Sequence, residues 1–172
     1  MTALRIRPIE AGEWPAYRDL RLQALRDSPE AFGSTFAAEH TRPDDAWASR
    51  IANAIASSND RVLFALDEGA ACGLLWCRRS ASEPAVADLY QMWVDPARRG
   101  LGAGRALLAD ALAWAQGLGV RRVRLGVTLA ESPAMGLYRA HGFRPVGEPE
   151  PLREGSALLA QAMELELPAR AG

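Results

Sequence analysis

The sequence predicts an α/β fold of the α+β type, in which helices flank one mixed, mostly antiparallel sheet. Residues 61–68 and 70–79 are apolar stretches separated by Gly69, a spacing typical of an antiparallel hairpin. Residues 85–128 then read as strand, helix and strand. Because hairpins precede the strand–helix–strand unit, an evenly alternating, doubly wound sheet is excluded.

The N-terminal elements follow from periodicity and end signals. Alternation predicts a first strand at 2–10, and Trp14, Tyr17, Leu20 and Leu25 lie near helical spacing in a helix at 11–30. Residues 27–40 combine turn residues with a short helix. Acidic residues open another helix at 43–57, where they suit the positive end of the helix dipole.

The C-terminal elements begin with a strand at 85–94, which Asp95 and Pro96 stop. A strong helix is predicted at 104–119, with Gly117 and Gly119 at its end. A strand at 120–128, a helix at 132–142 and a last strand at 158–167 complete the order β-α-α-β-β-β-α-β-α-β.

Composition indicates one globular domain over residues 1–172. Apolar residues make up 49% of the 172 residues, charged residues 24%, and the formal net charge is −1, which gives no sign of a nucleic-acid partner. No apolar run approaches the ~20 residues that cross a bilayer, and the first ten residues lack the apolar core of a signal peptide. We therefore expect a cytoplasmic protein with no membrane partner.

The two cysteines are expected to be buried, reduced thiols. Cys72 and Cys77 are five residues apart on one predicted strand, so their side chains should point to opposite faces. His40 and His141 are isolated in the sequence, and we expect no metal site.

The stretch "RRGLGAGR", residues 98–105, is the most informative one. It lies between a predicted strand and a predicted helix, where unpaired N–H groups and the helix dipole favour an anion. Gly100, Gly102 and Gly104 remove every second Cβ, and Arg98, Arg99 and Arg105 add positive charge. We infer a phosphate or pyrophosphate seat built mainly from backbone amides.

Known phosphate loops narrow this interpretation. A P-loop would need Lys-Ser/Thr after Gly104, and a dinucleotide loop would need glycine in place of Arg105, so both are excluded. "RGLGAG", from Arg99 to Gly104, instead matches Arg/Gln-x-x-Gly-x-Gly/Ala. With the preceding "MWVDPARRG" and the later "SPAMGLYRAHGF", the chain resembles the GCN5-related N-acetyltransferase (GNAT) superfamily over about residues 85–145. In the second motif Glu131 stands where the family usually has asparagine.

The resemblance implies acetyl-CoA as co-substrate and a reaction without a metal. Strand 89–94 would be bulged and splayed from strand 123–127, so that pantetheine lies in the opening and meets the main chain at Met92 and Val94. The pyrophosphate would lie on Arg99, Gly100, Gly102, Ala103, Gly104 and Arg105. The acceptor would be the primary amine of a small molecule or peptide. Dimers are common among similar proteins, and the oligomeric state stays open.

The resemblance also places the catalytic candidates. Tyr138 occupies the position from which the family commonly protonates the departing thiolate. Asp88 and Glu39 are the candidates for the general base, because Asp88 lies on the cofactor strand and helices of residues 1–60 wall the acceptor side. His40 and Glu131 are weaker candidates. The alternative function is a non-catalytic acyl-CoA-binding or sensor module of the same fold.

Overall fold

The computed structural model describes residues 4–169. Seven strands lie side by side in the order β1-β2-β3-β4-β5-β8-β6, and β7 pairs with β8. Among the described strands, β4 and β5 form the one parallel pair. The strands are β1 (Leu4–Pro8), β2 (Asp60–Asp67), β3 (Ala70–Arg79), β4 (Val86–Val94), β5 (Arg122–Thr128), β6 (Arg144–Pro145), β7 (Glu150–Pro151) and β8 (Leu159–Glu166).

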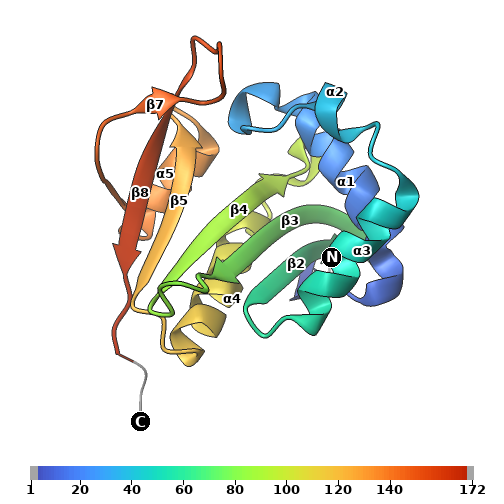
Figure 1. The fold of residues 1–172 in the computed structure, drawn as a ribbon, viewed down its shortest axis with the longest axis horizontal. Coiled ribbons are helices and arrows are strands. Elements are labelled where there is room, and N and C mark those ends of the chain that lie inside the picture. The colour runs from blue at the N-terminus through green and yellow to red at the C-terminus, as the bar shows by residue number, and fades with distance from the viewer. Residues whose placement is uncertain (1–3, 170–172) are drawn as a thin grey trace.

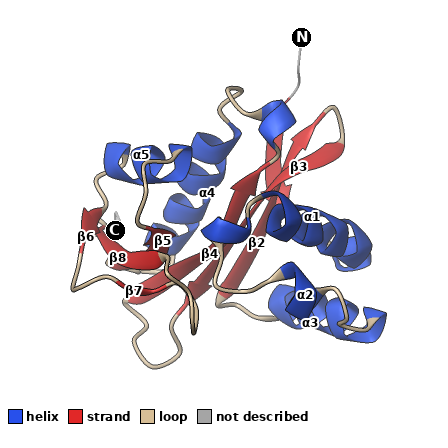
Figure 2. Ribbon diagram, turned by 90° about the horizontal axis from the view of Figure 1, so that it is seen from above, coloured by secondary structure: helices blue, strands red, loops and turns tan. Residues whose placement is uncertain are grey.

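Helices cover both faces of this sheet. Those of the N-terminal part lie on one face and the two later ones on the other (Figure 2). They are α1 (Trp14–Asp27), α2 (Phe36–Glu39), α3 (Asp44–Ala56), α4 (Ala103–Gly117) and α5 (Pro133–Ala140). Single 3-10 turns occupy Ala11–Glu13, Pro29–Ala31 and Pro96–Arg98. In the part of the chain that is described, no helix has the length and apolarity to cross a membrane.

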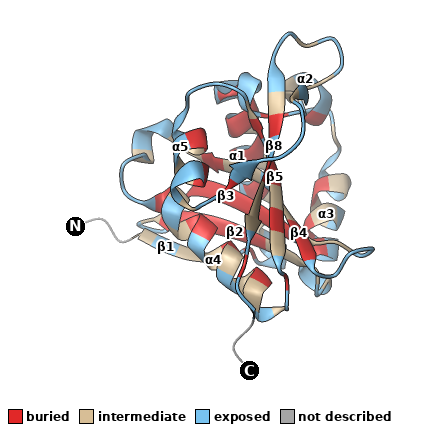
Figure 3. Cartoon of the chain, turned by 90° about the vertical axis from the view of Figure 1, so that its left-hand side faces the viewer, coloured by how far each residue is buried: buried red, intermediate tan, exposed pale blue. Residues whose placement is uncertain are grey.

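Two apolar cores follow from the alternation of side chains along the central strands. On β3, Leu75 and Cys77 pack toward α4, whereas Leu74 and Trp76 pack toward α1 and α3. Buried residues accordingly concentrate on the sheet and on the helix faces turned toward it (Figure 3). The predicted mixed fold is confirmed, and each main element lies within a few residues of its predicted range.

The cysteines depart from the prediction. Both are free and buried, but both belong to the core beneath α4 rather than to opposite faces. The cause is a register shift in the hairpin, where Ala65 pairs with Gly73 but the next residue, Leu66, pairs with Ala71. Cys72 is the extra residue of this bulge, so the simple alternation that the prediction used does not hold there.

Strands β4 and β5 separate along their length (Figure 1). They pair only between Val86–Asp88 and 122–124, whereas β8 pairs with β5 over 122–128. The end of β4 is therefore left without a neighbour on the β5 side. This is the splayed strand pair that the motifs imply.

Strand β4 also carries a bulge at its open end. Between the pairs Trp76–Tyr90 and Leu74–Trp93, two residues of β4 face one residue of β3. One of the two, Gln91, has a left-handed φ of 61°. The Tyr17 hydroxyl of α1 donates a hydrogen bond of 2.8 Å to its side-chain oxygen, which holds the bulge against the helix layer.

Candidate active site

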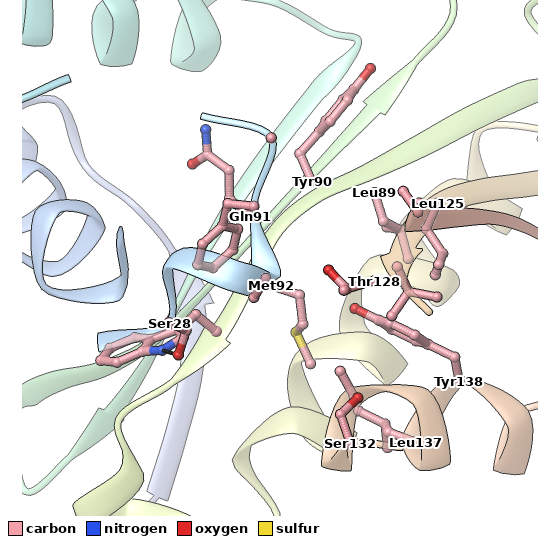
Figure 4. Close-up of a pocket in the computed structure, with 18 of the residues that line it drawn as sticks. Ser28, Leu89, Tyr90, Gln91, Met92, Leu125, Thr128, Ser132, Leu137 and Tyr138 are labelled. Carbon is pink, nitrogen blue, oxygen red and sulfur yellow. Dashed lines mark hydrogen bonds between the residues drawn. The ribbon is translucent and has the colours of Figure 1, made fainter. Parts of the chain in front are cut away.

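A large cleft passes through the gap between β4 and β5. Both strands line it, together with the start of α4, helix α5, the helices on the α1 side and the loop before β8 (Figure 4). The cleft thus reaches both faces of the sheet at the point where the sheet is open. Within residues 4–169, no three His, Cys, Asp or Glu side chains are grouped to hold a metal ion.

The glycine loop forms one end of this cleft. Asp95 caps the turn Pro96–Arg98 by accepting a 3.0 Å hydrogen bond from the Ala97 N–H, and the chain then enters α4 through Gly102. Gly100 and Gly102 have φ of 86° and 85°, a conformation that glycine adopts without strain. The backbone N–H groups of residues 100–105 donate to no acceptor among the described residues. Free amides at a helix start can hold a phosphate.

The third glycine also serves the packing of α4. A Cβ at Gly104 would lie 3.3 Å from Leu137 Cδ2 and 3.3 Å from Met92 Cε. Its missing side chain therefore lets α4 approach β4 and α5, although residue 104 also lines the cleft. Gly100 and Gly102 remain the glycines whose backbone conformation shapes the loop.

The arginines of the loop divide into two kinds. Arg98 turns away from the cleft and pairs with Asp67 at 3.2 Å. Arg99 lines the cleft, and its Nε donates to the Val94 carbonyl at 3.0 Å. Arg105 is exposed beside the free amides and has no ion-pair partner in the described part of the chain. Arg99 and Arg105 can therefore add charge to an anion seated on the loop.

The end of β4 presents unpaired backbone to the cleft. The Asp95 N–H donates to the Cys72 carbonyl at 2.8 Å, and opposite residues in antiparallel strands alternate between bonded and non-bonded pairs. The Gly73–Val94 pair is thus a non-bonded one, and the Val94 N–H points away from β3. Met92 lies in the bulge just before it. Both predicted contact residues line the cleft.

Tyr138 reaches the same space from the opposite wall. Ser132 caps α5 by accepting a 3.1 Å hydrogen bond from the Met135 N–H, and Tyr138 follows on the buried face of the helix. Its hydroxyl points toward the gap that Met92 and Thr128 border (Figure 4), and no described residue accepts or donates a hydrogen bond there. Burial raises the pKa of Tyr138, so the hydroxyl keeps its proton. Exposed Glu131 precedes the cap and pairs with Arg139 at 3.4 Å.

The two candidate bases are both paired with arginines. Asp88 lines the cleft where β4 and β5 still pair, and it accepts from Arg124 at 3.0 and 3.1 Å. Glu39 is buried on the α1 side of the cleft, accepts from Arg42 at 3.1 and 3.3 Å, and lies 3.7 Å from Arg50. The structure brings both carboxylates to the cleft, although not to the same wall of it.

His40 stays outside this arrangement. Its ring stacks on Phe36 with 4.9 Å between the centroids, and it does not line the cleft. Phe32, at the other end of the segment before α2, is buried and does line it.

Arg21 is a cleft residue that the sequence alone did not single out. It lies on α1, is buried, and lines the cleft on the same side as Glu39. Its place on a helix with several other arginines looks like part of a solvated face. Only the packing of α1 against the bulged end of β4 shows that this guanidinium is enclosed.

With this geometry in view, comparisons with known proteins give the family. A family model described as the acetyltransferase (GNAT) family matches residues 14–143, which is most of the chain. The chain belongs to the GNAT family. The resemblance predicted from the two motifs is therefore confirmed, and the matched range extends it into the N-terminal helices.

Curated relatives within this family include mycothiol acetyltransferases. The one from Kocuria rhizophila is 31% identical over 147 residues, which cover 81% of this GNAT chain and 46% of that protein. The one from Thermobispora bispora is 30% identical over the same length, with the same coverage. The chain thus spans about half the length of the curated relatives it matches.

Solved structures support the fold independently. A GNAT-family acetyltransferase from Streptococcus pneumoniae superposes with a TM-score of 0.81 at 22% identity, covering 96% of this chain and 100% of that one. A GNAT superfamily phosphinothricin acetyltransferase from Sinorhizobium meliloti, solved with acetyl-CoA, gives 0.79 at 20% identity, covering 95% and 88%. At these identities the likeness concerns the fold.

Proposed function

We propose that this chain transfers an acetyl group from acetyl-CoA to a primary amine of a small molecule or peptide, by direct attack of the amine on the thioester. The observation that carries the proposal is the pairing of two features across one cleft. Unbonded amides of residues 100–105 open onto it at the start of α4, and the Tyr138 hydroxyl points into it from α5.

Binding of the co-substrate would use the backbone. The amides of residues 100–105, with Arg99 and Arg105 beside them, would hold the pyrophosphate. The open end of β4 at Met92 and Val94 would pair with the pantetheine amides as a neighbouring strand would. A bound acetyl-CoA supplies the activated acetyl thioester, and its carbonyl would then lie near the free Val94 N–H.

Attack of the neutral amine nitrogen on that carbonyl makes the new C–N bond and places negative charge on the carbonyl oxygen. The Val94 N–H would stabilise this charge, because a donor that the strand already holds in place costs no reorganisation. When the C–S bond breaks, Tyr138 would give its proton to the departing sulfur, and its raised pKa suits a group that begins protonated.

The proton of the amine needs a separate acceptor. Asp88 and Glu39 are both paired with arginines, so the choice between them depends on their position in the cleft. We assign the base role to Glu39, acting through a bridging water, because it lines the wall of the cleft opposite the α4 loop. The Tyr138 hydroxyl argues against the alternative of a non-catalytic acyl-CoA-binding module, which would have no use for a proton donor in the cleft.

Release of free coenzyme A from acetyl-CoA in the presence of a broad panel of amines tests the proposal. Acetylation of at least one amine at a rate well above hydrolysis is the expected result. Binding of acetyl-CoA without transfer to any amine would instead favour the non-catalytic module. Tight binding of ATP or NAD with no affinity for coenzyme A would contradict both.

A further inference from the structure

Arg21 is a buried guanidinium for which the described part of the chain provides no counter-charge in direct contact. Its exposed fraction is 4%, and its Nε and Nη1 are closed off from solvent without any hydrogen-bond partner among the described residues. Nη2 is then the nitrogen that faces the cleft, of which Arg21 forms part of the wall. Burial is also the main cause that lowers the pKa of Arg21.

The contacts that Arg21 makes offset only a small part of the free-energy cost of burying its charge. The guanidinium carbon lies 4.6 Å from the centroid of the Phe32 ring, and a cation–π contact of this kind is only modestly favourable. An enclosed charge without an ionic partner costs more than this, and buried charges in proteins are normally paired. The unmet charge therefore needs an explanation from outside the chain.

Glu39, whose charge acts on Arg21 from a distance, is already engaged by other arginines. Its carboxylate is bonded to Arg42 and lies 3.7 Å from Arg50, and it makes no ion pair with Arg21. Glu39 is therefore only a partial counter-charge for Arg21. Both Arg21 and Arg50 line the cleft, so their charges border the space into which a ligand would enter.

Arg21 lies away from the phosphate seat that we propose at residues 100–105. Arg21 lies on α1, which packs on the face of the sheet opposite to α4, whose start carries the free amides (Figure 2). A ligand group at Arg21 would enter from the side of α1 and α3, and the thioester would enter from the side of α4. The two approaches meet at the open end of β4.

We propose that Arg21 binds a small oxyanion, a carboxylate or a phosphonate-type group, carried by the acceptor amine. This inference rests on the proposed acetyl transfer and names the class of its acceptor. An amine with such a group would be held at one end by the buried guanidinium, with its nitrogen left free to reach the thioester. A charge-assisted bond of this kind in an enclosed site favours the anionic acceptor over its neutral analogue by about tenfold to a hundredfold.

The decisive experiment compares matched acceptors. Steady-state kcat/KM at saturating acetyl-CoA is measured for a set of L-α-amino acids, for their α-carboxamides and for aminoalkylphosphonates. We expect at least one anionic acceptor to exceed its carboxamide by about tenfold or more, and the amino-acid and phosphonate arms show which oxyanion is preferred. Equal use of acids and carboxamides by the wild-type protein would overturn the inference while leaving the proposed acetyl transfer intact.

Two variants assign the preference to Arg21. Arg21→Gln should remove the discrimination between acid and carboxamide and leave the KM for acetyl-CoA within about twofold. Arg26→Gln is the matched control, because Arg26 lies on the same helix but is exposed and stacks on Phe36 outside the cleft. A preference that persists in Arg21→Gln would sink the assignment. Should that variant not fold, Arg21→Met provides a neutral side chain of similar length for an apolar surrounding.

A readout without catalysis separates the two proposals. The Tm of the wild-type protein should rise with millimolar concentrations of a preferred amino acid, and that rise should be absent in Arg21→Gln and present in Arg26→Gln. If no amine is acetylated but this pattern of Tm shifts holds, the oxyanion site stands and the acetyl transfer fails. If acetylation occurs and no oxyanion raises the Tm, the oxyanion site fails alone.

Discussion

The Asp88 carboxylate and the Arg124 guanidinium form a two-point ion pair at the last register position that joins β4 to β5. Both side chains are partly open to solvent, so we expect a coupling free energy of only about 0.5–1 kcal/mol in a double-mutant cycle of Asp88→Asn and Arg124→Gln. Urea denaturation measures it. Because the pair is assigned to structure, kcat should change less than about tenfold in either variant. A much larger loss of kcat in Asp88→Asn alone would identify Asp88 as the base.

Glu39→Gln tests the competing carboxylate. We expect kcat to fall by about a hundredfold with the KM for acetyl-CoA little changed, because a positioned base typically contributes ~10²–10⁴-fold. The control is Arg42→Gln, which removes the main partner of Glu39 but keeps the carboxylate. Equal losses in the two variants would mean that Glu39 acts only by holding the α2–α3 segment in place.

Tyr138→Phe removes only a hydroxyl that has no hydrogen-bond partner within residues 4–169. We expect the Tm to stay within a few degrees of the wild type and kcat to fall by about a hundredfold, because the thiolate loses its proton donor. Stopped assays for free coenzyme A at several pH values measure this. Burial raises the pKa of Tyr138, so the wild-type rate should show no alkaline loss attributable to this tyrosine near neutral pH. An unchanged kcat would remove Tyr138 from the mechanism.

Substitutions at two loop glycines should affect different properties, one the KM for acetyl-CoA and the other the stability of the fold. Gly102→Val places a branched side chain at a φ of 85°, which costs about 1–2 kcal/mol and reshapes the amide seat, so the KM for acetyl-CoA should rise about tenfold or more. Gly104→Val should chiefly lower the Tm, because its side chain must displace Met92 and Leu137. Gly136→Ala, in the open on α5, is the control and should change neither quantity adversely. If Gly104→Val raised the KM and Gly102→Val lowered only the Tm, the anion would have to bind closer to residue 104.

The buried thiol of Cys77 should make the folded protein less stable at alkaline pH. Burial raises the pKa of its thiol to about 12, whereas an unfolded chain has a cysteine pKa near ~8.5. Below that value both states hold the proton. Above it the unfolded chain releases the proton first, so the free energy of unfolding should fall by up to about 1.4 kcal/mol per pH unit until the folded thiol also ionises. Urea titrations between about pH 8 and 10.5 measure the slope. Cys77→Ala should have a lower stability at neutral pH and a shallower decline, and a slope equal to that of the wild type would contradict the assignment.

Local patterns were enough to predict much of this molecule. The "RRGLGAGR" loop and the helix after it are specified by neighbours in sequence, and so is the turn at Glu68–Gly69, where both residues have positive φ. The second motif placed Tyr138 on a helix whose cap is one of its own residues, Ser132. In these cases the interactions that decide the structure are short-range.

Features that depend on distant packing were missed. The left-handed conformation of Gln91 is tied to Tyr17, which is 74 residues away. Arg21 is buried because of the way α1 lies on the sheet, and no pattern within the sequence of α1 predicts this burial. The short strands β6 and β7 exist only because β8 supplies their hydrogen-bonding partner. The face of the sheet to which the Cys72 side chain points depends on a bulge, and a count of alternating residues along the strand does not predict that bulge.

The bulge in β4 makes the number of residues between Asp88 and Val94 a functional quantity in its own right. Two residues of β4 face one residue of β3 there, so losing one of them would restore regular pairing and leave Val94 opposite Gly73. A sequence shortened by one in this stretch would therefore still build the sheet and keep the register on both sides of the deletion. It would lose the local bend that a bulge gives to a strand, and the end of β4 would follow β3 instead of parting from β5.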